Sequence, residues 1–346
     1  MIMFANDYSE GCHPRILELL QETNLEQAAG YESDQFCDRA RELIKSACQA
    51  PTADVHFFSS GTLTNLTVVT ATLRPHQAVL STVQGHIATN ETGAIEGTGH
   101  RVITYPTEDG KLTPAHVREA RERFRSEHVT QPKMVYISQS TELGTIYSKA
   151  ELEALALSCR ECGFLLYLDG ARLGYALAAE ENDLFLPDIA RLCDIFYIGG
   201  NKVGALIGEA LVIINPDLKE DFRHIMKQHG ALTAKGRLLG VQFIALFEDG
   251  LYYRIGQNAI TTAMRIKETC IAKGYGFRAD SPTNLQFPIL PHGLIAKLRD
   301  KYMLGAITKI DDDHSAVRIV TSWATRSEHV DAICADIQGY CSQVNL

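Results

Sequence analysis

Short apolar runs alternate with stretches of helical spacing along the first two thirds of the chain. Each run holds four or five residues and is rich in β-branched and aromatic side chains, which is typical of buried strands. Five of them occur, at residues 78–82, 102–105, 134–137, 164–168 and 195–198. With helices between most of these runs, the alternation predicts a mainly parallel wound sheet with helices on both faces.

Helix-boundary signals support this pattern. Thr113 followed by Pro114 predicts an N-cap with proline at the first helical position. Ser148 and Glu151 form a capping-box signature, and the helix that they open is expected to stop at Gly163. Cys159 and Cys162 fall at the end of that helix, so we interpret their CxxC spacing as structural.

The pattern changes after the apolar run at 211–214. Long helices are expected from about residue 218 to 273, then short strands at 285–289 and 317–320 and a closing helix over 328–344. We therefore predict two domains. Residues 1–250 form a large α/β domain with an N-terminal arm, and residues 251–346 form a small α+β domain.

Composition narrows the setting. A chain of 346 residues exceeds one compact core. It has no apolar run of about 18 residues that would span a bilayer. A net charge of −9 argues against nucleic acid as a partner. Polar residues follow Met1–Phe4 at once, and nine scattered cysteines suit a reducing compartment, so a cytoplasmic protein is expected.

Charged residues at two strand ends carry the first chemical signal. Asp169 and Arg172 follow the run at 164–168, and Lys202 follows the run at 195–198 beside Gly199 and Gly200. In wound sheets, ligands bind beyond the carboxyl ends of the strands. A lysine in a dry, glycine-lined turn can form an imine, and a carboxylate at a strand mouth suits a pyridinium nitrogen. We predict a pyridoxal phosphate site with Lys202 as the imine-forming lysine and Asp169 as the ring-nitrogen partner.

Two further segments fit the same cofactor. Ser60, Gly61 and Thr62 stand between an apolar run and a helix, where free backbone amides and the helix dipole favour a phosphate. His86 lies just past a strand, where an imidazole can stack on the pyridine ring and can accept a proton from a substrate hydroxyl. Lys227 and Lys235 are rivals to Lys202, but their helical setting favours solvated faces or contact with a neighbouring subunit.

These residues resemble the L-threonine aldolases, within the β-eliminating lyase group of fold type I (aspartate-aminotransferase-like) pyridoxal phosphate enzymes. The resemblance implies that the wound sheet is of the seven-stranded type. The resemblance spans nearly the whole chain, and the low-specificity threonine and phenylserine aldolases are the most similar subgroup. The motifs that carry it are Asp7, Tyr31–Asp34, Ser60–Thr62, His86–Glu91, Asp169–Arg172, Lys202 and Arg318–Trp323.

The resemblance implies a lyase that cleaves L-threonine, L-allo-threonine or related β-hydroxy-α-amino acids to glycine and an aldehyde. Arg172 and Arg318 would bind the substrate carboxylate, and Arg172 would also belong to the cofactor site. It further implies a homotetramer, a dimer of dimers with sites at dimer interfaces. Tyr31 would approach the neighbouring subunit's cofactor, as part of the substrate site.

The chain departs from the family pattern at three places. Glu142 stands where many relatives have a histidine, so Glu142 or an ordered water would replace that histidine in activating the hydroxyl. Asn6 replaces a substrate-contacting serine, and Asn201 replaces a hydroxyl residue. No metal site is predicted, because the cluster at 311–314 has the character of an exposed turn between strands.

Two other interpretations stay open. The same cofactor and lysine would serve a β-eliminating lyase or an aminotransferase acting on another L-amino acid. A non-catalytic protein that retains the fold is disfavoured, because Lys202, Asp169 and both arginines are all present. The sequence leaves open the preferred side chain at Cβ, threo or erythro selectivity, the oligomer size, the physiological role and any cation requirement.

Overall fold

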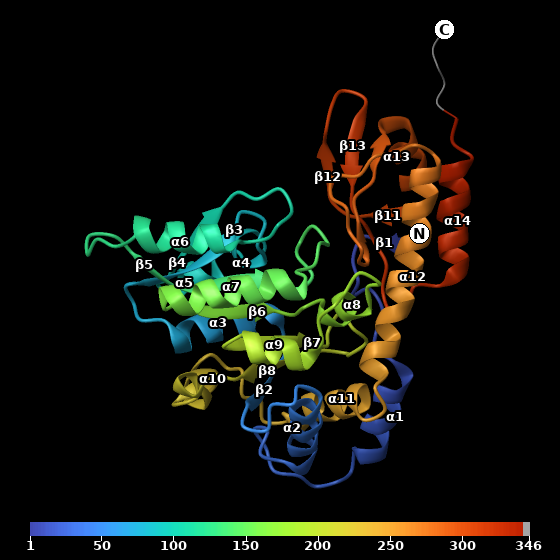
Figure 1. Ribbon diagram of the computed structural model, residues 1–346. Coiled ribbons are helices and arrows are strands. Elements are labelled where there is room, and N and C mark those ends of the chain that lie inside the picture. Colours follow the sequence, from blue (N-terminus) through green and yellow to red (C-terminus); the bar gives the residue numbers. More distant parts are fainter. Residues whose placement is uncertain (342–346) are drawn as a thin grey trace.

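A seven-stranded sheet forms the centre of the computed structural model, which describes residues 1–341 (Figure 1). Its strand order is β2-β8-β7-β6-β5-β3-β4. Only β8 runs antiparallel to its neighbours, so the predicted mainly parallel sheet is confirmed. The strands are β2 (Asp54–Phe58), β3 (Gln77–Thr82), β4 (Arg101–Tyr105), β5 (Gln131–Ser138), β6 (Leu165–Asp169), β7 (Ile195–Gly199) and β8 (Glu209–Ile213).

Helices cover both faces of this sheet. On one face lie α2 (Gln35–Ala47), α6 (Pro114–Arg123), α7 (Lys149–Cys162), α9 (Leu186–Leu192) and α11 (Arg237–Phe247). On the other lie α3 (Gly61–Thr72), α5 (Ala94–Gly97) and α10 (Phe222–Gln228). Neighbouring strand residues point to opposite faces, so Leu166 packs into the first core and Tyr167 into the second. Two hydrophobic layers thus hold the strand ends in fixed positions.

The predicted helix boundaries are confirmed at the positions where capping residues mark them. Helix α6 begins at Pro114 after Thr113, and α7 has the Ser148–Glu151 capping box. It ends at Gly163, whose positive φ of 68° favours glycine. The remaining helices of this part of the chain are α1 (Pro14–Thr23), α4 (His86–Thr89), α8 (Leu173–Ala178) and the 3-10 turn Pro216–Leu218.

A second, smaller group of elements follows α12 (Leu251–Ala272). It contains β9 (Leu285–Gln286), β10 (Ile289–Pro291), α13 (His292–Arg299), β11 (Tyr302–Leu304), β12 (Ile307–Lys309), β13 (His314–Val317), β14 (Ile319–Val320) and α14 (Ser327–Gln338). The cluster at 311–314 is the turn between β12 and β13, as predicted. The predicted closing helix at 328–344 corresponds to α14, but α14 ends at Gln338, so the predicted end was too late. Residues 342–344 lie outside the described part of the chain.

The N-terminal arm connects the two groups. Strand β1 (Ile2–Phe4) pairs in parallel with β11, so the first residues of the chain join a sheet of the C-terminal part. Helix α12 packs against α8 at one end and along α14 at the other (Figure 1). The division at residue 250 stays a prediction. The arm and α12 place the C-terminal group beside the group that contains the central sheet.

Among residues 1–341, no helix is long and apolar enough to cross a membrane.

Candidate active site

A cavity of about 190 Å³ opens at the carboxyl ends of β5, β6 and β7. It brings together most of the residues singled out from the sequence, namely Ser60, Gly61, Thr62, His86, Asp169, Arg172 and Lys202. Neither rival lysine lines it. Lys227 lies 4.3 Å from the ring of Tyr31, and Lys235 lines a separate surface pocket.

Asp169 ends β6 and is held by four hydrogen-bond donors. Its Oδ1 accepts from the Tyr197 hydroxyl at 2.5 Å and from the Ala171 amide at 3.0 Å. Its Oδ2 accepts from the Tyr136 hydroxyl at 2.5 Å and from the Asn65 amide at 3.3 Å. These four donors, two on each oxygen, fix the orientation of this buried carboxylate.

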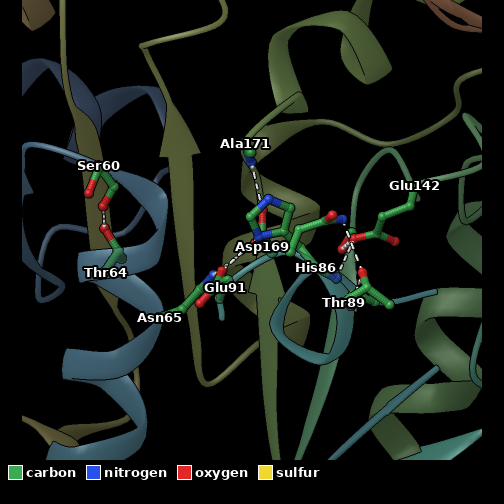
Figure 2. A network of polar contacts seen from close by, with 12 residues as sticks. Ser60, Thr64, Asn65, His86, Thr89, Glu91, Glu142, Asp169 and Ala171 are labelled. Atoms are coloured by element: carbon green, nitrogen blue, oxygen red, sulfur yellow. Dashed lines mark hydrogen bonds and ion pairs between the residues drawn. The ribbon is translucent and has the colours of Figure 1, made fainter. Parts of the chain in front are cut away.

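His86 begins α4 and is supported by a second buried carboxylate. Its Nδ1 lies 2.7 Å from Glu91 Oε1 (Figure 2). Burial opposes protonation of the imidazole, but the Glu91 hydrogen bond and the charge of Asp169 outweigh it and raise the pKa of His86. The pair therefore fixes the ring and leaves Nε2 for other partners.

Lys202 follows β7 in a turn built on close backbone contacts. A Cβ on Gly170 would lie 1.9 Å from the carbonyl oxygen of Tyr197, and one on Gly199 would lie 2.4 Å from that of Ala171. Only glycine fits at these two places, which explains the glycines beside Asp169 and Lys202. The Tyr175 hydroxyl donates to the Lys202 carbonyl and anchors the turn.

Glu209 is a site residue that the sequence analysis missed. It is 2 % exposed, and its Oε2 accepts from the Gly200 amide at 3.0 Å. It opens β8, where it pairs with Gly199 of β7 and Phe58 of β2, and it lines the cavity with Lys202. Burial raises the pKa of Glu209 to about 8, although Lys202 opposes the rise. The antiparallel strand gave no sequence signal that its first residue would face the site.

The predicted phosphate residues stand at the start of α3. Ser60 is the N-cap and its hydroxyl accepts from the Leu63 amide at 3.4 Å. All three residues of the Ser60–Thr62 turn line the cavity. A Cβ on Gly61 would lie 3.0 Å from the Tyr197 hydroxyl, so the backbone approaches the cavity closely. A phosphate here would meet the amide end of a twelve-residue helix.

The two arginines are near one another. Arg172 forms a two-point ion pair with buried Asp7, at 2.7 Å through Nε and 3.0 Å through Nη2. Arg318 donates to the Ala5 carbonyl at 3.2 Å, and its buried Nε has no hydrogen-bond partner among the described residues. Burial and the charge of Arg172 lower the pKa of Arg318. An anionic carboxylate beside these side chains would relieve both effects.

Three predicted substrate residues, Arg318, Asn6 and Tyr31, are not among the residues that line this cavity. The Asn6 side chain accepts from the Tyr8 amide at 3.0 Å and the Ser9 hydroxyl at 2.8 Å, so it shapes the N-terminal arm. Tyr31 is 45 % exposed and has a positive φ of 57°. Within one chain, these side chains make no contact with the cavity, and their substrate roles stay predictions.

Glu142 does line the cavity. Its Oε1 accepts from the His86 amide at 2.9 Å and from the Ser138 hydroxyl at 2.8 Å (Figure 2). Burial is the main cause that raises the pKa of Glu142, and Asp169 adds to it. The carboxyl group of Glu142 thus lies next to His86 in the wall of the same cavity.

The donor set fits pyridoxal phosphate. An amine, a buried carboxylate, a histidine and a helix start line one cavity at the edge of a wound sheet. Among residues 1–341 there is no cluster of three or more His, Cys, Asp or Glu side chains that could hold a metal ion.

Comparisons with known proteins agree with this geometry. A family model described as "Beta-eliminating lyase" matches residues 10–290. The chain is 30% identical over 349 residues to a low specificity L-threonine aldolase of Pseudomonas aeruginosa, covering 97% of this chain and 96% of that protein. A threonine aldolase structure from Leishmania major has a TM-score of 0.96 at 46% identity, with 98% of this chain and 99% of that one covered. A putative histidinol-phosphate aminotransferase from Erwinia carotovora has a TM-score of 0.74 at 12% identity, which shows the fold alone.

Proposed function

Because the chain belongs to the β-eliminating lyase family, we propose that it is a pyridoxal phosphate-dependent aldehyde-lyase. Its substrates are L-threonine, L-allo-threonine or related β-hydroxy-α-amino acids, and its products are glycine and an aldehyde. The observation that carries this proposal is the single cavity shared by Lys202, Asp169 and the Glu91-supported His86.

Bound pyridoxal phosphate would withdraw electrons from the substrate α-carbon and so weaken its bonds. Lys202 holds the cofactor covalently, and the start of α3 holds its phosphate. Asp169, held by its four donors, would pair with the ring nitrogen. His86 would stack on the ring and limit its movement.

The substrate residues decide which bond breaks. Arg172 and Arg318 bind the α-carboxylate, because a guanidinium fork matches a carboxylate better than an ammonium does. Holding the carboxylate at two points would fix the orientation of the α-carbon and so select Cα–Cβ as the bond that is cleaved. His86 Nε2, with Glu142 beside it, accepts the proton of the β-hydroxyl as the aldehyde forms.

β-Elimination and transamination use the same cofactor, but no observation favours them here. The aminotransferase among the similar structures shares 12% identity with this chain and therefore bears on the fold, not on the reaction.

The test is product analysis by NMR, after incubation of the pyridoxal phosphate-loaded protein with L-allo-threonine, L-threonine and L-phenylserine. Glycine and the matching aldehyde are expected, and their rates rank the side chains. A keto acid with ammonia would instead assign the protein to elimination.

The proposal extends to assembly and location. We infer a homotetramer, a dimer of dimers, in the cytoplasm. Exposed apolar side chains close to the Lys202 turn and on the N-terminal arm support contacts between subunits. Leu206 is 48 % exposed, Ile207 41 % and Tyr8 55 %. Such a patch is typical of a surface that another subunit covers. Light scattering of the purified protein tests the tetramer.

A further inference from the structure

Asn65 lies below the cavity, one turn into α3 from the phosphate-binding residues. It is fully buried and does not line the cavity. Its side chain points between Glu91 and Asp169, the two carboxylates that support His86 and the cofactor ring nitrogen (Figure 2).

The Asn65 amide bridges these carboxylates. Its Nδ2 donates to Glu91 Oε1 at 2.7 Å and to Asp169 Oδ2 at 3.3 Å. Ionised carboxylates only accept, so the NH₂ end of the amide must face them. The other end, Oδ1, accepts from the buried Tyr167 hydroxyl at 2.6 Å, which fixes the amide in this orientation.

The two carboxylates depend on Asn65 to different degrees. Without it, Asp169 would still accept from two tyrosine hydroxyls and one backbone amide. Glu91 would keep only His86, because its Oε2 is buried and has no hydrogen-bond partner among the described residues. Two nearby like charges in a buried site cannot both persist without donors, so Glu91 is the one whose charge Asn65 maintains.

We propose that Asn65 is a positioning residue that sets the tautomer of His86 by keeping Glu91 ionised. An ionised Glu91 accepts the Nδ1–H of the neutral imidazole. The Nε2 lone pair is then left free to accept the proton of the substrate hydroxyl. Asn65 thus controls the base through Glu91, without touching the substrate.

The opposite state of the pair holds one proton more, which comes from the solvent. When Asn65 is removed, Glu91 takes up one proton and donates its O–H to Nδ1 of His86. The imidazole then carries its own proton on Nε2, and that atom becomes a donor. A histidine in this state cannot accept the hydroxyl proton, so cleavage slows while carboxylate binding by the arginines is unchanged.

The inference rests on the proposed function, but its first test needs neither cofactor nor substrate. Histidine tautomers differ in their ¹⁵N NMR shifts. The cofactor-free protein, labelled at histidine, would be measured over a pH series that extends above neutral, because the pKa of His86 is raised and only the neutral ring has a tautomer. His86→Gln identifies the signal. The variants are Asn65→Leu, which removes the donor at similar volume, and Tyr167→Phe, which frees the amide to turn.

Thr67→Val is the matched control. Thr67 lies on the same helix and is also fully buried, but its hydroxyl contacts His229 Nδ1 at 3.2 Å, away from the network. It reports the effect of losing one buried hydrogen bond from α3. The control should keep the wild-type tautomer and wild-type cleavage rate.

The wild-type protein should show Nδ1–H at His86, and Asn65→Leu should show Nε2–H. With the cofactor loaded, Asn65→Leu should lower kcat for L-allo-threonine at least about 10-fold at nearly constant KM. Tyr167→Phe should shift both readouts in the same direction, and it decides the matter if Asn65→Leu does not fold. An Nε2–H signal in the wild-type protein, or Nδ1–H retained in both variants, overturns the inference. A wild-type protein that releases no glycine overturns the proposed function instead, and the NMR result still stands.

Discussion

Replacing Glu209 by glutamine tests whether the buried carboxyl group beside Lys202 is neutral in the folded protein. Glu209 is 2 % exposed and accepts one hydrogen bond, from the Gly200 amide. Glutamine has the shape of a protonated glutamate, and its carbonyl can accept the same bond. The substitution therefore removes the ability to ionise and leaves the packing in place.

The size of the expected change in stability follows from the pKa of Glu209. Burial raises the pKa of Glu209 from 4.5 to about 8, which corresponds to roughly 5 kcal/mol at 1.36 kcal/mol for each unit. The folded state holds the proton more tightly than the unfolded state. The stability that this proton contributes is complete below pH 4.5, falls as the pH rises, and is lost above about 8. Glutamine does not ionise, so the stability of the variant relative to the wild type should increase as the pH rises.

The assay is thermal unfolding of the cofactor-free proteins at acidic, neutral and alkaline pH. A chain of 346 residues has an unfolding entropy that makes 1 kcal/mol worth about 1.4 °C. Glu209→Gln should match the wild type near pH 4.5 and unfold about 7 °C higher above pH 8. Glu161→Gln, at an exposed position on α7, serves as control and should show no such trend. A difference between Glu209→Gln and wild type that does not change with pH would refute the reasoning.

Three further substitutions test other parts of the site. Lys202→Ala should abolish the imine with pyridoxal phosphate, measured as a borohydride-fixed adduct by mass spectrometry; an adduct that persists would move the role to another lysine. Asp169→Ala should bind the cofactor weakly and lose almost all activity, measured by cofactor titration and aldehyde release. Asp7→Asn should destabilise the protein by about 3 kcal/mol, because Arg172 is left buried without its charged partner; denaturant titration measures the loss, and unchanged stability would show that the pair is not needed for folding.

The sequence predicted the fold well where patterns are local. The apolar runs at 78–82, 102–105, 134–137, 164–168 and 195–198 all became strands of one sheet. Capping residues placed the ends of α6 and α7, because a cap is satisfied within a few residues of chain. The pairing of β1 with β11 joins residues about 300 positions apart in the chain. Nothing in either short segment specifies such a partner.

The same distinction explains the site. Lys202, Asp169 and the turn at Ser60 were recognisable because each stands at the end of an apolar run, where the topology of a wound sheet places ligands. Asn65 and Glu209 have no such mark. Asn65 is one of several polar residues in α3, and its partners Glu91 and Asp169 come from segments 26 and 104 positions away.

The charges of the site depend on these unmarked residues. Hydroxyls from β5 and β7 reach both oxygens of Asp169. Burial between two strands raises the pKa of Glu209 to about 8. Sequence motifs therefore indicate which chemistry is possible, because they show which residue types are present. Protonation states, which decide whether His86 accepts or donates a proton, are set by contacts that form only when the sheet and α3 come together.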